Sequence, residues 1–297
     1  IASAKSRVFH DNPDWFIKDT NGAPLNAADV TFRGWRDAPW YFLDPTHPDA
    51  RVYIQSVFRI MKHEWKVDYF KLDANSWGAL DFGLRFCKDV TSVEAYRIGM
   101  EALWEVCGED TFLLGCNAPL WPSLGVVNGM RVTDDINRHA DTVKSLSMQC
   151  FQRNWMHGRL WINDPDCLVQ VDTKTGVLAG FFAKAKPIHK RKENEAMYRY
   201  AAAYIRASGG MVLSGDRLYA LSEYDSGILN KLLASERTAA TFNSDYSVGT
   251  IRTATDTEYL LFNSGKMPRV FHVEDTGTFI DMFTGSETAT DALLSIT

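Results

Sequence analysis

The chain of 297 residues carries a formal net charge of −5, and 45% of its residues are hydrophobic while 23% are charged. These values are ordinary for a globular protein built from one large domain, or from a large and a small one. The acidic balance, with a pI near 5.8, gives no electrostatic footprint for nucleic acid. No apolar run approaches the ~18 residues of a membrane-spanning helix, so the sequence predicts neither a nucleic-acid partner nor a membrane partner.

Helical and strand-like segments alternate from residue 48 to residue 216. Glu94 in the first turn and Gly108 at the end mark one of the helices, which is expected to start near Thr91 or Ser92. The alternation is typical of βα units around a parallel sheet. The predicted helices span 48–65, 92–108, 136–153 and 194–210. The predicted strands span 68–73, 111–116, 129–133, 158–163 and 211–214.

Polar residues cluster just after the predicted strands. In a (β/α)₈ barrel the carboxyl ends of all strands face the active site, and several strands supply catalytic residues. No G-x-G-x-x-G opens a helix, so a dinucleotide-binding fold has no motif support. The sequence therefore predicts an α/β protein with a (β/α)₈ TIM barrel. The clustered polar residues are Asp73, Asn75, Asn117, Asp134, Asp135, 163–166 and 214–216.

The predicted strands are too few to close such a barrel. Five are clear, 40–44 is a candidate sixth, and the first residues read as the tail of another. A closed barrel needs eight strands. We therefore expect the first strands of the barrel to be missing from this chain, and the sheet to be open beside 68–73.

From about residue 236 the pattern changes to short runs rich in Thr and aromatic residues, separated by Gly, Asn, Ser and Asp. Such runs predict antiparallel strands. The expected organisation is a catalytic barrel over 1–235, followed by a C-terminal β-sandwich domain over 236–297 that the chain does not contain in full.

The five cysteines are widely spaced, and no C-x-x-C occurs. An odd number at such spacing argues against a disulfide framework or a zinc site, and it favours a reducing compartment, hence a cytoplasmic location. The cysteines are Cys87, Cys107, Cys116, Cys150 and Cys167.

The stretch "DYFKLDAN" (68–75) places Lys71 and Asp73 on the same face of one strand, because side chains two residues apart point the same way. An ammonium there keeps Asp73 ionised, as a nucleophile requires. Asp134 and Asp135 end a strand two further along, and two carboxylates flanking one sugar is the arrangement of glycoside hydrolysis. The structural alternative is an internal ion pair for Lys71 and Asp73, and a cap on a helix that begins at Ile136 for one of the two later aspartates.

Four ordered motifs together resemble glycoside hydrolase family 36, the α-galactosidase family, which is related to the raffinose-type synthases. They are "VFHDNPDWFIKDTNGAP" (8–24), "DYFKLDAN" (68–75), "GCNAPLWPSLGVVNGMRVTDD" (115–135) and "RLWINDPDCL" (159–168). The resemblance implies a retaining α-galactosidase that acts on terminal α-linked galactose of oligosaccharides and needs no metal or organic cofactor. It also implies that the chain begins in the third barrel strand.

The resemblance also implies roles for single residues. Asp73 matches the nucleophile of the family's K-x-D motif, and Lys71 matches its substrate-binding lysine. Asp135 lies four residues after Arg131 and matches the acid/base, although Asp134 replaces the small residue or proline usual beside it. Further residues expected near galactose are Cys116, Gly129 and Arg131. Asp164 and Asp166 match a loop after the seventh strand, for which we favour structural hydrogen bonding.

Several rivals stay open at this point. The same scaffold could transfer galactose to a sugar, as raffinose-type synthases do, or hydrolyse α-N-acetylgalactosaminides. A non-catalytic carbohydrate-binding protein is a further alternative. A calcium-dependent hydrolase would use Asp134, Asp135, Asp164 and Asp166, but the spacing of a calcium loop is absent. The sequence is also compatible with a homo-oligomer.

Overall fold

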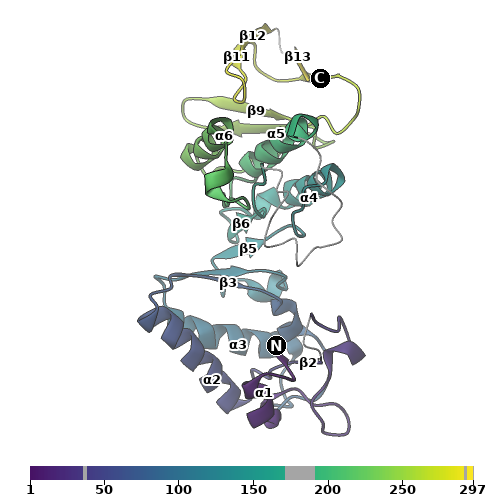
Figure 1. The fold of residues 1–297 in the computed structure, drawn as a ribbon, viewed down its shortest axis with the longest axis vertical. Helices are drawn as coiled ribbons and strands as arrows, with labels where there is room; N and C mark the ends of the chain where they lie inside the picture. The colour runs from purple at the N-terminus through teal and green to yellow at the C-terminus, as the bar shows by residue number, and fades with distance from the viewer. Residues whose placement is uncertain (36–38, 171–190, 291–292, 297) are drawn as a thin grey trace. The chain divides into compact units, whose positions relative to one another are not determined.

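The computed structural model describes residues 1–35, 39–170, 191–290 and 293–296 (Figure 1). Its contacts divide the chain into two compact units, Ile1–Arg131 and Val132–Thr297. This division differs from the boundary expected at 235/236, which separates barrel from β-domain and stays a prediction. None of the helices in the described ranges combines the length and the apolar character needed to cross a bilayer.

Three parallel strands form the sheet of the first unit, in the order β3-β4-β5. Lys71 of β3 lies opposite Leu114 of β4, which in turn lies opposite Gly129 of β5. The strands occur where the sequence predicted them, and the long crossover from β3 to β4 contains α3, as parallel pairing requires. The elements of this unit are β1 (Ala2–Ser3), α1 (Arg7–Asp11), β2 (Trp40–Tyr41), α2 (Pro48–Arg59), β3 (Tyr69–Leu72), α3 (Ser92–Cys107), β4 (Phe112–Gly115) and β5 (Gly129–Arg131).

Helix α3 begins and ends where its sequence signals predicted. The Thr91 hydroxyl accepts the backbone N–H of Glu94, and the Glu94 carboxylate accepts the N–H of Thr91 in return, which completes a capping box. Gly108, at φ 72°, ends the helix. Both expected boundaries are therefore confirmed.

Helix α2 continues into a π-helical turn, Ile60–Glu64, that the sequence did not predict. The turn places the Lys62 ammonium 3.1 Å from carboxylate oxygens of both Asp68 and Asp110. These two aspartates lie just before β3 and β4, and the Lys62 side chain is only 8% exposed. The Lys62 ammonium therefore links the amino ends of β3 and β4. Asp73 lies at the opposite, carboxyl end of β3.

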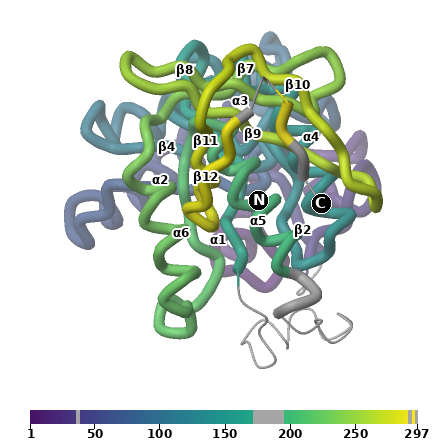
Figure 2. The backbone as a smooth tube through the Cα atoms, turned by 90° about the horizontal axis from the view of Figure 1, so that it is seen from above, coloured from purple at the N-terminus to yellow at the C-terminus, as the bar shows by residue number. Residues whose placement is uncertain are grey.

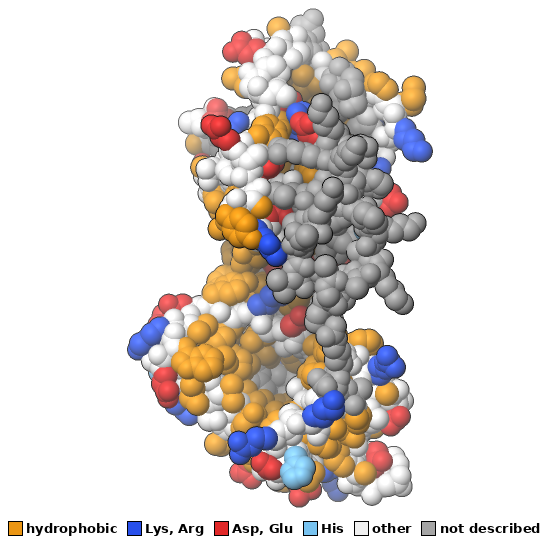
Figure 3. Space-filling view, in the orientation of Figure 1, with side chains coloured by type: hydrophobic (Ala, Val, Ile, Leu, Met, Phe, Trp, Pro, Cys, Tyr) orange, Lys and Arg blue, Asp and Glu red, His pale blue; other side chains and the backbone are white. Residues whose placement is uncertain are grey.

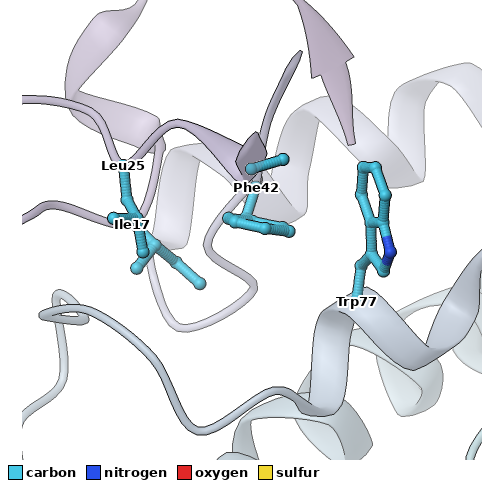
Figure 4. Close-up of a cluster of buried hydrophobic side chains, with 5 residues drawn as sticks. Ile17, Leu25, Phe42 and Trp77 are labelled. Atoms are coloured by element: carbon cyan, nitrogen blue, oxygen red, sulfur yellow. The ribbon is translucent and has the colours of Figure 1, made fainter. Parts of the chain in front are cut away.

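The segment 40–44 was a candidate barrel strand, and this expectation is wrong for the described structure. Trp40 and Tyr41 pair antiparallel with Ala2 and Ser3, away from the parallel sheet. The physical reason is packing, because Phe42 points into a hydrophobic cluster with Ile17, Leu25 and Trp77 (Figure 4).

The open sheet expected beside 68–73 agrees with the described residues. In those ranges β3 pairs only with β4, and the exposure of its residues alternates. Tyr69 is 40% exposed, whereas Phe70 is buried. Figure 3 shows further hydrophobic side chains at the surface of the first unit, and the large ones among the exposed residues include Trp65 and Phe86.

The second unit combines three helices with a short strand and a series of antiparallel strands. Helix α5 occupies the predicted range. The elements are α4 (Ala140–Arg153), β6 (Ile162–Asp164), α5 (Arg191–Ser208), α6 (Glu223–Ala234), β7 (Thr241–Phe242), β8 (Val248–Arg252), β9 (Thr257–Leu261), β10 (Arg269–His272), β11 (Gly277–Ile280), β12 (Glu287–Thr290) and β13 (Leu293–Ile296).

Two predicted strands are shorter than expected. Residues 158–161 form a turn, in which the Gly158 N–H donates to the Trp161 carbonyl at 2.9 Å, so β6 begins only at Ile162. No strand is assigned at 211–214, where a single parallel bridge joins Leu168 to Ser214. Both segments still run in the direction expected for a parallel strand, but each makes only a few of the backbone hydrogen bonds that the predicted strand length would allow.

Antiparallel strands after residue 240 agree with the predicted β-rich segment (Figures 1 and 2). The β7-β8-β9 sheet is tied to α5 by Arg206, whose guanidinium lies 2.9 Å from the Glu258 carboxylate and also donates to the carbonyls of Glu236 and Thr238. Arg206 is buried, so these bonds replace the water that the cation loses.

His157 links the start of β6 to the chain that enters the β-rich segment. Its Nδ1 accepts the backbone N–H of Asn163 at 3.2 Å, and its Nε2 donates to the Arg237 carbonyl at 3.1 Å. Burial lowers the pKa of this imidazole, and the neighbouring Arg237 charge acts in the same direction. Protonation at Nδ1 would also break the bond to Asn163.

We therefore expect His157 to make stability depend on pH in the acid range. Because its folded pKa lies below the unfolded value of about 6.5, the unfolded state takes up the proton first. The stabilisation is present above about pH 6.5 and is lost as the pH falls towards the folded pKa. Urea unfolding of the wild type and of His157→Gln between about pH 8 and pH 5 measures this. A stability difference between the two proteins that does not change with pH would contradict the assignment.

Candidate active site

Site residues of the first unit share one face of the parallel sheet. Lys71, Leu114 and Gly129 are in register across β3, β4 and β5. Side chains two positions further along a strand return to the same face, which places Asp73, Cys116 and Arg131 there as well. The sheet therefore brings together four residues that the sequence singled out: Lys71, Asp73, Cys116 and Arg131.

Asp73 lies at the carboxyl end of β3, and both it and Lys71 are exposed. Its Oδ1 accepts the backbone N–H of Ala74 at 2.7 Å, in a turn where Ala74 adopts φ 58°. This left-handed residue turns the chain sharply at the end of the strand. The following loop is held in place by the Ser76 N–H, which donates to the Asn117 carbonyl after β4 at 2.7 Å. Backbone hydrogen bonds therefore hold the Asp73 carboxylate and the loop after it at the carboxyl end of the sheet.

Cys116 is surrounded by the other three residues of the group. The Arg131 guanidinium lies 3.9 Å from its sulfur, and the charges of Lys71 and Asp73 also act on the thiol. Burial and the negative charge of Asp73 raise the pKa of the thiol to about 11, against the opposing effects of Lys71 and Arg131. The thiol is therefore protonated at neutral pH.

This pKa predicts a graded reactivity of the cysteines. Cys116 and Cys150 are buried with pKa values of about 11 and about 12, whereas Cys87 and Cys167 are partly exposed. Because the thiolate is the nucleophile, Cys116 should react with iodoacetamide at pH 8 on the order of a hundredfold more slowly than an ordinary thiol. Residue-level mass spectrometry of alkylated native protein measures this, with alkylation in urea as the control. Labelling of Cys116 as fast as Cys87 would be inconsistent with its burial beside Asp73.

Gly129 has a packing reason for being glycine. A Cβ at this position would lie 2.7 Å from the Phe112 ring and 3.0 Å from Leu114. The Phe112 ring in turn stacks on Tyr69, with ring centroids 5.6 Å apart. Gly129 therefore allows an aromatic ring to lie across the strands on the face that carries Lys71, and its expected place near galactose stays a prediction.

The second unit contains Asp134 and Asp135, both exposed. The expectation that one of them caps a helix at Ile136 is wrong, because α4 begins at Ala140 with His139 as its N-cap. Asp134 instead pairs with Gln149 of α4, whose side-chain amide donates to the Asp134 carboxylate and accepts the Asp134 N–H, both at 2.9 Å. Neither Asp134 nor Asp135 therefore caps helix α4, and this structural alternative is wrong.

The loop after β6 is buried and hydrogen-bonded, as the structural reading of Asp164 and Asp166 predicted. The Asp164 carboxylate accepts the N–H of Asp166 at 2.8 Å, and Asp166 accepts the N–H groups of Cys167 and Ile136. Within the described ranges, no group of three or more His, Cys, Asp or Glu side chains is arranged to hold a metal ion.

Sequence reasoning missed the residues that support the segment 132–139, which carries Asp134 and Asp135 and is called the acidic segment below. Gln149 and the Arg138–Asp216 ion pair had no motif, and Asp166 was noticed only as part of a loop. Each contact joins residues 15 to 78 positions apart, so nothing in the local sequence signals it.

No family model matches the chain. Among solved structures, TtGalA, an α-galactosidase from Thermus thermophilus solved with p-nitrophenyl α-D-galactopyranoside, is similar with a TM-score of 0.62 and 23% identity over 88% of this chain. A family-27 β-L-arabinopyranosidase from Geobacillus stearothermophilus has a TM-score of 0.67 and 17% identity over 94% of this chain. A putative α-N-acetylgalactosaminidase from Bacillus halodurans has a TM-score of 0.62 and 15% identity over 94%.

At these identities the likeness shows a shared α/β fold, seen in glycoside hydrolases. The chain covers 49% of the Thermus enzyme and 64% of each of the other two. It therefore spans about half to two thirds of the length of these structures.

Proposed function

We propose that this chain carries the catalytic residues of a retaining α-galactosidase that releases terminal α-linked galactose from oligosaccharides. The observation that carries the proposal is the grouping of Lys71, Asp73, Cys116 and Arg131 on one face, at the carboxyl ends of parallel strands. The shared fold with glycoside hydrolases, α-galactosidases among them, supports it. The four sequence motifs of family 36 are independent support.

Asp73 is the nucleophile of the first step in this proposal. Its carboxylate forms a bond to the anomeric carbon while the bond from that carbon to the leaving oxygen breaks. Lys71 and Arg131 share the face of the sheet that carries this carboxylate, where their positive charges are available to bind the sugar. The Ala74 N–H donates to the same carboxylate and helps to orient it.

Asp135 is the acid/base. It gives its proton to the leaving oxygen as the first bond breaks, and it then removes a proton from the water that attacks the glycosyl-enzyme. Two inversions at the anomeric carbon return galactose in its original α configuration. The choice of Asp135 over Asp134 rests on its place four residues after Arg131, which matches the R-x-x-x-D pattern of the family that the sequence resembles.

The proposed architecture is a (β/α)₈ barrel to which β3, β4 and β5 of the first unit and β6 of the second contribute strands, followed by a β-domain over 236–297. The half-length coverage of the Thermus enzyme supports the expectation that further strands complete the barrel. A closed sheet and a cytoplasmic location are likewise proposals.

A second candidate is α-N-acetylgalactosaminidase activity on the same residues. The similarity to a putative enzyme of that type favours it, and the choice depends on the space beside the sugar's 2-position. Transfer of galactose to a second sugar, as in raffinose-type synthases, is the other alternative, and it would use the same two aspartates.

The stereochemical course tests the proposal. The full-length protein should hydrolyse p-nitrophenyl α-galactoside, and proton NMR should show α-galactose as the first product, before mutarotation. Parallel reactions with the N-acetylgalactosaminide and with added sucrose separate the alternatives. First-formed β-galactose would exclude double displacement, and no turnover of any of these substrates would remove the glycosidase proposal altogether.

A further inference from the structure

The backbone on both sides of Asp135 is held by side chains from two other elements. The N–H of Asp134, on one side, donates to Oε1 of Gln149 on α4 at 2.9 Å. The N–H of Ile136, on the other side, donates to Oδ2 of Asp166 at 2.6 Å. The backbone N–H groups of both neighbours of Asp135 are thus bound by partners 15 and 30 residues away from them.

Asp166 is itself fixed more firmly than a surface carboxylate. It is 7% exposed and adopts φ 72°, a left-handed conformation rare for a residue other than glycine. Its N–H donates to Asp164, which is 1% exposed, and its second oxygen accepts the Cys167 N–H at 2.8 Å. A strained residue with both oxygens used by backbone N–H groups is a rigid anchor for the chain at Ile136.

The far end of the same segment is tied down by an ion pair. Arg138 contacts Asp216, and the side chain of Asp216 is 1% exposed. The second oxygen of Asp216 accepts the N–H of Gln170 at 2.5 Å. No helix or strand is assigned between Arg131 and Ala140, so side chains from other parts of the second unit help to fix the segment that carries Asp135.

From this arrangement we infer that Asp166 and Gln149 are positioning residues for Asp135, acting through the backbone N–H groups of its two neighbours, Asp134 and Ile136. The inference rests on the proposed function, in which Asp135 is the acid/base. Proton transfer requires a heavy-atom distance of about 2.6–3.2 Å, so a small displacement of this backbone reduces catalysis without removing the carboxylate. Neither residue touches substrate in this scheme.

The test separates positioning from simple stability by varying the leaving group. Asp166→Asn in the full-length protein leaves one oxygen for two N–H donors, and Gln149→Met removes both bonds to Asp134 at similar volume. For each variant, kcat/KM for a substrate with a poor leaving group, such as raffinose, should fall about 10- to 100-fold. For the dinitrophenyl galactoside, which needs little protonation, kcat/KM should change less than about threefold.

Asp44→Asn is the matched control. Asp44 is also 1% exposed and accepts backbone N–H groups, from Thr46 at 2.9 Å and from Phe86 at 2.6 Å, but it belongs to the first unit. Its replacement should lower the unfolding temperature and leave the ratio of the two kcat/KM values unchanged within about twofold.

Failure of the inference and failure of the proposed function give different results. If Asp135→Ala shows the selective loss on raffinose but Asp166→Asn and Gln149→Met behave like Asp44→Asn, the positioning role is wrong. If Asp135→Ala itself shows no selective loss, the acid/base assignment is wrong and the inference falls with it. If Asp166→Asn does not fold, Gln149→Met decides the question alone.

Discussion

Replacing Asp73 by glycine is expected to lower the hydrolysis of aryl α-galactosides by at least about 10⁴-fold, because no other group can form the glycosyl-enzyme. Azide or formate should restore part of the rate, since a small anion can enter the space that the side chain leaves. Azide takes the place of the nucleophile and attacks once, so the product should be the β-galactosyl azide. Product analysis by NMR measures both effects.

Asp89→Gly is a suitable control, because Asp89 is an exposed residue of a turn in the same unit. It should retain near wild-type activity and show no azide product. Substantial activity of Asp73→Gly without azide, or an α-azide product from it, would be incompatible with Asp73 as the nucleophile.

Replacing Asp135 by alanine is expected to lower kcat by about 10²- to 10⁴-fold, with a loss that depends on the substrate. A dinitrophenyl leaving group needs little protonation, so formation of the glycosyl-enzyme should survive while its hydrolysis slows. Rapid-mixing kinetics should therefore show a burst of dinitrophenol. Azide should intercept the covalent intermediate and give the α-galactosyl azide, opposite to the product from Asp73→Gly.

Asp134→Ala is the matched comparison for this variant. It removes the neighbouring carboxylate, but the backbone N–H that binds Gln149 remains, so the loss should be far smaller. If Asp134→Ala gave the burst and the α-azide while Asp135→Ala stayed active, the roles of the two neighbours would be reversed.

The sequence predicted the parallel strands and helix α3 of the first unit, because these elements depend on local periodicity and capping, whereas the roles of the site residues stay a prediction. The alternation along β3 was enough to place Lys71 and Asp73 on one face, and the capping signals of Thr91, Glu94 and Gly108 located α3 within one residue. Parallel pairing then followed from the order of strands and helices, and the register added Cys116 and Arg131 to the same face.

Prediction failed where distant contacts decide the conformation. The apolar spacing of 136–153 is helical throughout, yet α4 begins only at Ala140, because Ile136 and Arg138 bind Asp166 and Asp216. Helical periodicity describes which side chains could share a face, but it does not reveal competing partners for the first turn. The segment 40–44 failed for the same reason, since burial of Phe42 took precedence over the strand pattern.

Helix α4 contacts both the segment that carries Asp135 and the β-rich C-terminal segment. Gln149 and Arg153 bind the chain around Asp134 and Val132, while the Phe151 ring stacks on Phe242 of β7 with centroids 4.2 Å apart. The Asn154 amide, just beyond the helix, donates to the Ala240 carbonyl at 3.2 Å. A chimaera that exchanges the β-rich C-terminal segment between related enzymes must therefore inherit α4 together with it. Recombination at residue 235 would pair α4 with strands from a different protein, and we expect it to disturb the position of Asp135, the proposed acid/base.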